Sequence, residues 1–161
     1  MGTQQIILVI GGMVLLGLLA LTFYNSYNTK TDLDIYNQAI ITASGIGQSM
    51  IDEIQTKAFD EKTVSKRVNN VSQLTAVGAL GPDSAETSPA NYDDIDDYKN
   101  YVRLDTLNTL GVFTTRVDVN YAVKSNPNQT SSSQTFAKRI DIFVTNTYLK
   151  DTLKLNSIST Y

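Results

Sequence analysis

The sequence has no cysteine, no histidine and no tryptophan among its 161 residues. Without cysteine it offers no disulfide and no thiolate nucleophile, and without histidine it lacks the commonest metal ligand and the commonest general base. It also has no glycine-rich phosphate loop, no zinc-ligand spacing and no serine paired with a base. We therefore expect a protein that is not an enzyme and that carries no cofactor.

Charge is scarce and mixed in sign. The formal net charge is −3 and the pI is about 4.8, with acidic and basic residues interspersed along the chain. A protein that binds nucleic acid needs clustered lysine and arginine, so we expect no specific binding of nucleic acid. No charged residue precedes Lys30, and no proline precedes Pro82.

The longest apolar stretch runs from Ile6 to Phe23. As a helix it would be ~27 Å long, close to the ~30 Å hydrocarbon core of a bilayer. Because the stretch is apolar on every side, we expect it to lie in lipid or among copies of itself. Residues 1–5 include no basic residue, which argues against a cleaved signal peptide. A plain single-pass anchor is the alternative interpretation.

An amphipathic helical pattern follows over residues 24–57. Apolar and small residues recur there at alternating steps of three and four, which places them on one helical face. They are Leu33, Tyr36, Ile40, Ala43, Gly47, Met50 and Ile54. Without proline, residues 1–57 can form one helix, and any break is expected in the polar segment 25–31. Residues 58–161 are predicted to form a globular head.

Residues 58–100 show no strong periodicity, and the glycines, prolines and serines between residues 78 and 89 are typical of loops. Four aspartates lie within five positions there: Asp93, Asp94, Asp96 and Asp97. Such an oxygen-rich cluster can bind Ca²⁺, although the spacing does not fit an EF-hand loop. The other interpretation is a solvated acidic turn or short helix whose carboxylates cap backbone N–H groups. The sequence leaves both open.

From residue 112 the periodicity changes to two, which is typical of half-buried strands. One run extends from Phe113 to Val123, a second from Phe136 to Val144 and a short third from Thr152 to Thr160, with a polar connection at 125–133. An antiparallel meander of this kind needs a cover for its apolar face, and the stripe from Leu33 to Ile54 can supply it. The predicted fold class is α+β, a long N-terminal helix packed on an antiparallel sheet.

This combination resembles the type IV pilin superfamily, in which the apolar run begins at the sixth residue of the mature chain, as it does here at Ile6. Leu80–Asp83 and Tyr92–Tyr98 are similar to the variable-domain entry of pilins related to the mannose-sensitive haemagglutinin type. Lys138–Thr147 and Thr152–Ile158 are similar to the final strands of such proteins. Together these segments cover most of the chain.

The sequence departs from the family pattern at two positions. Mature pilins usually have glutamate at the fifth residue, where it is thought to pair with the terminal amine of a neighbouring subunit. This chain has Gln5, which can form hydrogen bonds but carries no charge. No proline lies near Thr22, where pilins often kink, and no basic leader precedes Ile6.

The resemblance implies a structural subunit of an extracellular pilus-like filament. Identical subunits would reside in the inner membrane before a pilus assembly machinery adds them to a helical polymer. The implied filament core comprises Gln4, Gln5, Ile6, Ile7, Val9, Ile10, Met13, Val14, Leu16, Gly17, Leu18 and Leu21. The alternatives are a pseudopilin of a type II-like secretion system and a monomeric, membrane-anchored binding module. Asn70 and Asn128 begin sequons and are candidate glycosylation sites.

Overall fold

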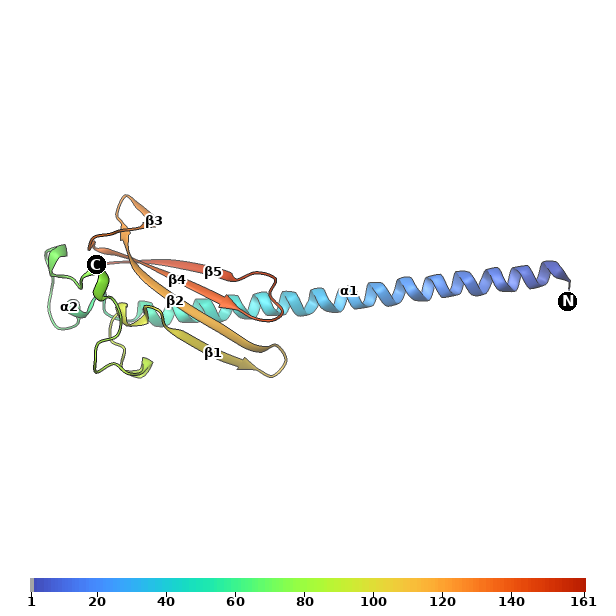
Figure 1. Ribbon diagram of the computed structural model, residues 1–161, viewed down its shortest axis with the longest axis horizontal. Helices are drawn as coiled ribbons and strands as arrows, with labels where there is room; N and C mark the ends of the chain where they lie inside the picture. The colour runs from blue at the N-terminus through green and yellow to red at the C-terminus, as the bar shows by residue number, and fades with distance from the viewer. Residues whose placement is uncertain (1) are drawn as a thin grey trace. The chain divides into compact units, whose positions relative to one another are not determined.

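The computed structural model describes residues 2–161, and these form one long helix, several short helices and a five-stranded antiparallel sheet (Figure 1). Helix α1 spans Thr3–Gln55, and four strands lie in the spatial order β1-β2-β4-β5. Their bounds are Val102–Leu107 for β1, Gly111–Val123 for β2, Ala137–Thr145 for β4 and Leu153–Thr160 for β5. The remaining strand, β3 (Asn126–Thr130), pairs with the end of β2. The predicted α+β class is confirmed.

Helix α1 continues through the polar segment 25–31, where the sequence suggested a break. The hydroxyls of Thr29 and Thr31 donate hydrogen bonds of 2.9 and 3.1 Å to the carbonyl oxygens of Asn25 and Tyr27, so these side chains are satisfied within the helix. The chain divides into two compact units inside α1. The N-terminal unit ends at Gln38, and the head comprises Ala39–Tyr161.

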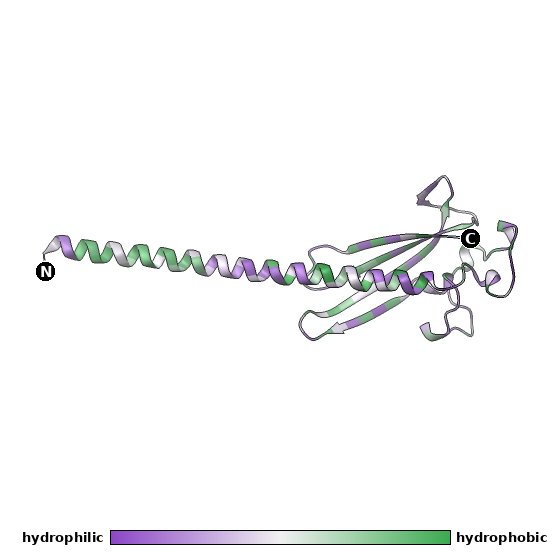
Figure 2. Ribbon diagram, turned by 180° about the vertical axis from the view of Figure 1, so that it is seen from behind, coloured by the Kyte–Doolittle hydropathy of each residue, from purple (hydrophilic) through white to green (hydrophobic). Residues whose placement is uncertain are grey.

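The main core of the head lies between α1 and one face of the sheet. Figures 1 and 2 view the head from opposite sides and show this part of the helix lying along the sheet. A Cβ added at Gly47 would lie 2.6 Å from Leu155 Cδ1, so the helix and β5 are in close contact at this glycine. The strands contribute six fully buried apolar residues to this core: Phe113, Val117, Val119, Ile140, Ile142 and Val144.

The helical stripe that the sequence assigned to this core is only partly buried. Ala43, Gly47, Met50 and Ile54 are buried, whereas Tyr36 and Ile40 are half-buried. Leu33 is 51% exposed and belongs to the N-terminal unit, so its assignment to the helix–sheet contact is a correction. The pattern of threes and fours continues past the last turn that packs on the sheet, because periodicity marks a face of the helix without marking where its cover ends.

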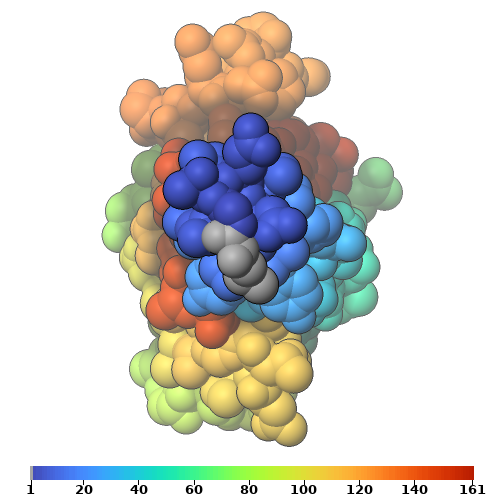
Figure 3. Space-filling view, turned by 90° about the vertical axis from the view of Figure 1, so that its right-hand side faces the viewer, coloured from blue at the N-terminus to red at the C-terminus, as the bar shows by residue number. Residues whose placement is uncertain are grey.

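The structure contains two strands that the sequence pattern did not predict, β1 and β3. Strand β1 pairs along its whole length with β2, from Val102 opposite Arg116 to Leu107 opposite Gly111. Strand β3 lies in what was predicted to be a polar connection, and all of its residues are exposed. Figure 3 shows its segment, in orange, as a projection at one edge of the head.

The segment between α1 and β1 forms a second, smaller layer of the head. It contains α2 (Glu61–Val64) and the short 3₁₀ helices η1 (Val71–Gln73), η2 (Val77–Ala79), η3 (Pro89–Asn91) and η4 (Asp96–Tyr98). Phe59, Val68 and Leu74 from this segment pack with Tyr121 of β2 in a hydrophobic cluster. This layer holds the acidic residues that the sequence singled out.

Candidate functional site

Two regions of the molecule depart from the ordinary arrangement of residues in a soluble protein. The first is the apolar stretch of α1, residues 6–23. Its large apolar side chains are all exposed, the least being Ile6 at 47% and the most Leu8 at 76%. Figure 2 shows the ribbon green over this stretch, and α1 is long and apolar enough to cross a membrane. The glutamines Gln4 and Gln5 and Gly17 are exposed as well.

The second region is a cluster of buried charged side chains in the head. It is assembled by backbone pairing between two segments that are distant in sequence. The N–H of Ala58 donates to the carbonyl oxygen of Asp93 at 2.9 Å, and the N–H of Ile95 donates to the carbonyl oxygen of Ala58 at 3.0 Å. This short parallel bridge brings η4 and its aspartates beside Asp60, the residue that caps α2.

Lys138 of β4 is the cation of this cluster, and it is 0% exposed. Its Nζ donates to Asp60 Oδ2 at 2.9 Å, to the carbonyl oxygen of Phe59 at 2.7 Å and to Asp96 Oδ1. The hydroxyl of Tyr121 also donates to Asp60 Oδ2, at 2.9 Å. A buried ammonium with three oxygen acceptors is well satisfied, because buried charges need both an ion pair and hydrogen bonds.

Asp60 organises the other side of the cluster. Its carboxylate accepts hydrogen bonds from the N–H of Lys62 at 3.1 Å and from the N–H and hydroxyl of Thr75 at 3.1 and 3.0 Å. Burial alone would raise the pKa of Asp60, but Lys138 and the hydrogen bonds lower it below its usual value. Asp60 therefore stays ionised and links α2, the loop at Thr75 and strands β2 and β4.

The aspartates around η4 have raised pKa values, in contrast to the lowered pKa of Asp60. Burial raises the pKa of Asp94 to about 8, and the neighbouring charges of Asp96 and Asp97 add to the effect. Burial also raises the pKa of Asp97 to about 7 and that of Asp96 to about 6, although Lys138 partly offsets the rise at Asp96. The carboxylates outnumber the cations close to them, so their negative charge is costly.

Comparison with known proteins adds no relative. No family model, no curated protein and no solved structure matches this chain.

The acidic cluster differs from the solvated turn that was one of its two interpretations. Asp94, Asp96 and Asp97 are 0%, 2% and 3% exposed, and only Asp93 among the four aspartates is exposed. The same interpretation also expected carboxylates that cap backbone N–H groups, and these hydrogen bonds are present within the turn itself. Asp94 Oδ1 accepts from the N–H of Asp96 and Asp97, and Asp97 Oδ2 accepts from the N–H of Asp93 and Asp94. The turn is capped internally and buried.

Sequence reasoning missed Asp60 and Lys138. A signal for Lys138 was present, because period two places it in phase with Ile140, Ile142 and Val144 on the apolar face. A lysine on such a face needs a buried anionic partner. The signal for Asp60 was weaker, since an aspartate three residues before Thr63 indicates only a helix cap.

Both candidate glycosylation sites are exposed at the surface of the head. Asn70 caps η1, its Oδ1 accepting from the N–H of Ser72 at 3.1 Å. Asn128 lies in β3. Their modification stays a prediction.

Proposed function

We propose that this protein is a structural subunit of a helical filament, assembled through residues 6–23 of α1. The observation that supports the proposal most directly is the exposure of every large apolar side chain in this stretch, with no charged residue before Lys30. Such a surface is not stable in water, so lipid or other protein must cover it.

The free energy of exposing this stretch to water rules out a monomer in water with the stretch uncovered. Thirteen large apolar side chains of residues 6–23 are exposed. Burying one such side chain contributes about 1.5–3 kcal/mol, so the whole stretch represents on the order of 20 kcal/mol. This exceeds the total stability of a typical domain, ~5–15 kcal/mol. The stretch must therefore lie in an apolar environment, either in lipid or among other protein.

Membrane and filament can supply those two environments in turn. In lipid the helix is already dehydrated, so its association with sister helices depends on close packing and not on the hydrophobic effect. Gly11, Gly12 and Gly17 suit such packing, because small residues let neighbouring helices approach closely. Repetition of one heterologous contact gives an open helical polymer. The inner membrane before assembly and the cell surface afterwards are the locations this function requires.

The test compares a charge placed inside the apolar stretch with the same charge placed outside it. Ile10→Asp puts a carboxylate into residues 6–23, and Ile41→Asp puts one on an exposed α1 isoleucine of the head; the two isoleucines are 57% and 72% exposed. Wild type and Ile41→Asp should form filaments in negative-stain micrographs after detergent removal, whereas Ile10→Asp should form none and keep a folded head by circular dichroism.

Two results would count against the proposal. One is wild-type protein that stays a single particle in detergent or lipid under every condition, which would favour the membrane-anchored binding module. The other is an Ile10→Asp variant that still polymerises. A short periplasmic assembly instead of long surface filaments would favour the pseudopilin alternative, which electron micrographs of whole cells distinguish.

A further inference from the structure

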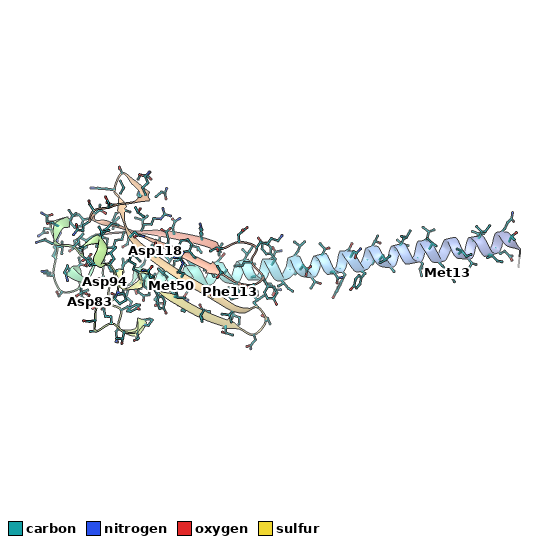
Figure 4. All side chains as sticks on the ribbon, viewed as in Figure 1. Met13, Met50, Asp83, Asp94, Phe113 and Asp118 are labelled. Atoms are coloured by element: carbon teal, nitrogen blue, oxygen red, sulfur yellow. The ribbon has the colours of Figure 1, made fainter. Side chains whose placement is uncertain are left out.

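Five carboxylates line one pocket of about 210 Å³ in the head. They belong to Glu61, Asp83, Asp94, Asp96 and Asp97, and the one cationic residue that also lines the pocket is Lys62. Figure 4 labels two of these residues, Asp83 and Asp94, in the head. The lining of this pocket is rich in carboxylate oxygens.

Two buried oxygen atoms of this lining have no hydrogen-bond partner. Within residues 2–161, the buried side-chain atoms without a partner are Asp94 Oδ2, Asp96 Oδ2 and the hydroxyl of Thr115. The other carboxylate oxygen of each aspartate is occupied: Asp94 Oδ1 accepts from the N–H of Asp96 at 2.6 Å, and Asp96 Oδ1 pairs with Lys138. Asp94 and Asp96, two residues that line the pocket, thus each keep one buried oxygen without a partner, although an unpaired buried acceptor costs about 1–3 kcal/mol.

The buried charges do not balance. Asp60, Asp94, Asp96 and Asp97 are each at most 3% exposed, and Lys138 is the buried cation among them. Lys138 is fully engaged by Asp60, Asp96 and the carbonyl oxygen of Phe59. In the part of the chain that the structure describes, no cation is paired with Asp94, and its Oδ2 has no hydrogen-bond partner.

A second group of carboxylates lies at the rim of the pocket. One carboxylate oxygen from each of Glu61, Glu86 and Asp93 lies within 4.8 Å of the others. Glu61 also lines the pocket, so it belongs to both groups of carboxylates.

We propose that this pocket binds a calcium ion, with the unused oxygens of Asp94 and Asp96 among its ligands. The donors are all oxygen, which selects hard divalent cations over zinc or copper. Calcium takes six to eight oxygens in irregular geometry, and the pocket is built from short helices and loops that offer both carboxylates and backbone carbonyls. Magnesium prefers a tight octahedron and gives up its water reluctantly, so it fits this pocket less well.

Calcium binding would add a further link between three segments of the head. The pocket is lined by residues of α2, of the loops around η2 and of η4, and the ion would link all three. The expected effect is therefore greater stability of the head, and it does not depend on filament formation.

The experiment uses the full chain in detergent and follows thermal unfolding of the head by circular dichroism, in EDTA and in CaCl₂ up to about 10 mM. With calcium at ~100 times its dissociation constant, we expect the Tm to rise by about 5–10 °C. Isothermal titration with CaCl₂ gives the stoichiometry, expected to be one ion per chain. MgCl₂ should give a smaller rise.

Asp94→Asn is the decisive variant, because asparagine keeps the Oδ1 acceptor for the N–H groups of Asp96 and Asp97 and loses the charge. In EDTA its Tm should equal or exceed that of wild type, since a costly buried charge has gone, and calcium should no longer raise it. Asp151→Asn, at an exposed position outside the pocket, should respond to calcium as wild type does. Glu86→Gln, at the rim, should weaken binding about 10-fold or more.

Three results would overturn the proposal: no calorimetric binding of calcium, an undiminished response in Asp94→Asn, or equal responses to calcium and magnesium. If Asp94→Asn fails to fold, Glu86→Gln decides alone, and an unchanged calcium affinity in that variant overturns the site. Filament formation is scored separately, so a failure here leaves the proposed function untouched.

Discussion

The apolar stretch of α1 exposes hydrophobic side chains, whereas the head buries charged ones. Leu8 is 76% exposed and Lys138 is 0% exposed, which reverses the usual distribution of these residue types. The two reversals differ in kind. The buried charges are largely satisfied inside the chain by hydrogen bonds and ion pairs, but the exposed apolar residues have no cover within it. One region therefore stabilises the isolated head, and the other requires a cover from outside the chain, either lipid or protein.

The largest expected effect comes from removing the buried cation. Lys138→Met should destabilise the head by about 3–5 kcal/mol, because Asp60 and Asp96 would be left as uncompensated buried charges. The Tm measured by circular dichroism should fall by roughly 10–20 °C. Lys154→Met is the control, since Lys154 is exposed on β5, and it should change the Tm by a few degrees at most.

A second variant separates ion pairing from packing. If the loss in Lys138→Met arises from unpaired charge, then adding Asp60→Asn and Asp96→Asn should recover part of the Tm. No recovery would mean that Lys138 acts mainly through its contacts with the rings of Phe59 and Tyr121, which lie 4.7 and 5.1 Å from its Nζ.

The next prediction compares two methionines on the same helix. Met50 is 0% exposed in the head and Met13 is 70% exposed in the apolar stretch (Figure 4). Met50→Ala should cost the head about 2–5 kcal/mol through lost packing. Met13→Ala should leave the Tm of the head unchanged and weaken filaments against detergent. Equal effects on the head would contradict the division of α1 into two units.

The smallest expected effect comes from glycines. A Cβ added at Gly45 in the head or at Gly12 in the apolar stretch would meet nothing within 4 Å. Gly45→Ala should stabilise the head by about 0.5–1 kcal/mol, because alanine has the higher helix propensity. Gly12→Ala should leave the Tm of the head alone, and a reduced heat resistance of the filament would show that neighbouring helices approach closely at this position.

Much of the fold follows from periodicity alone. The strands β2 and β4 and the long helix were predictable because their buried faces are apolar and regularly spaced. Strand β1 was not, because its pattern is inverted: Arg103 faces inward to pair with Glu53, while Val102 and Leu104 are 51% and 65% exposed. Strand β3 is exposed on both faces, so its sequence carries no alternation at all.

The contacts of the buried charged residues could not be predicted from the sequence, for a different reason. The partners of Lys138 lie 78 residues away at Asp60 and 42 residues away at Asp96. No local pattern encodes such a contact, and a run of aspartates looks solvated until a fold places a lysine beside it. The apolar stretch was predictable because its length and hydrophobicity are read directly from the composition, whereas the charge cluster depends on tertiary structure.

The threonine hydroxyls within α1 give the N-terminal unit a mechanical property. The carbonyl oxygens of Asn25 and Tyr27 each accept a side-chain hydroxyl in addition to a main-chain donor, which weakens the local helical ladder. Under tension along its axis, α1 would lengthen more easily at residues 25–31 than in a helix without these side-chain bonds. Going from about 1.5 to about 3.4 Å per residue, these seven positions would add roughly 13 Å. The helix would thus contain a short extensible segment.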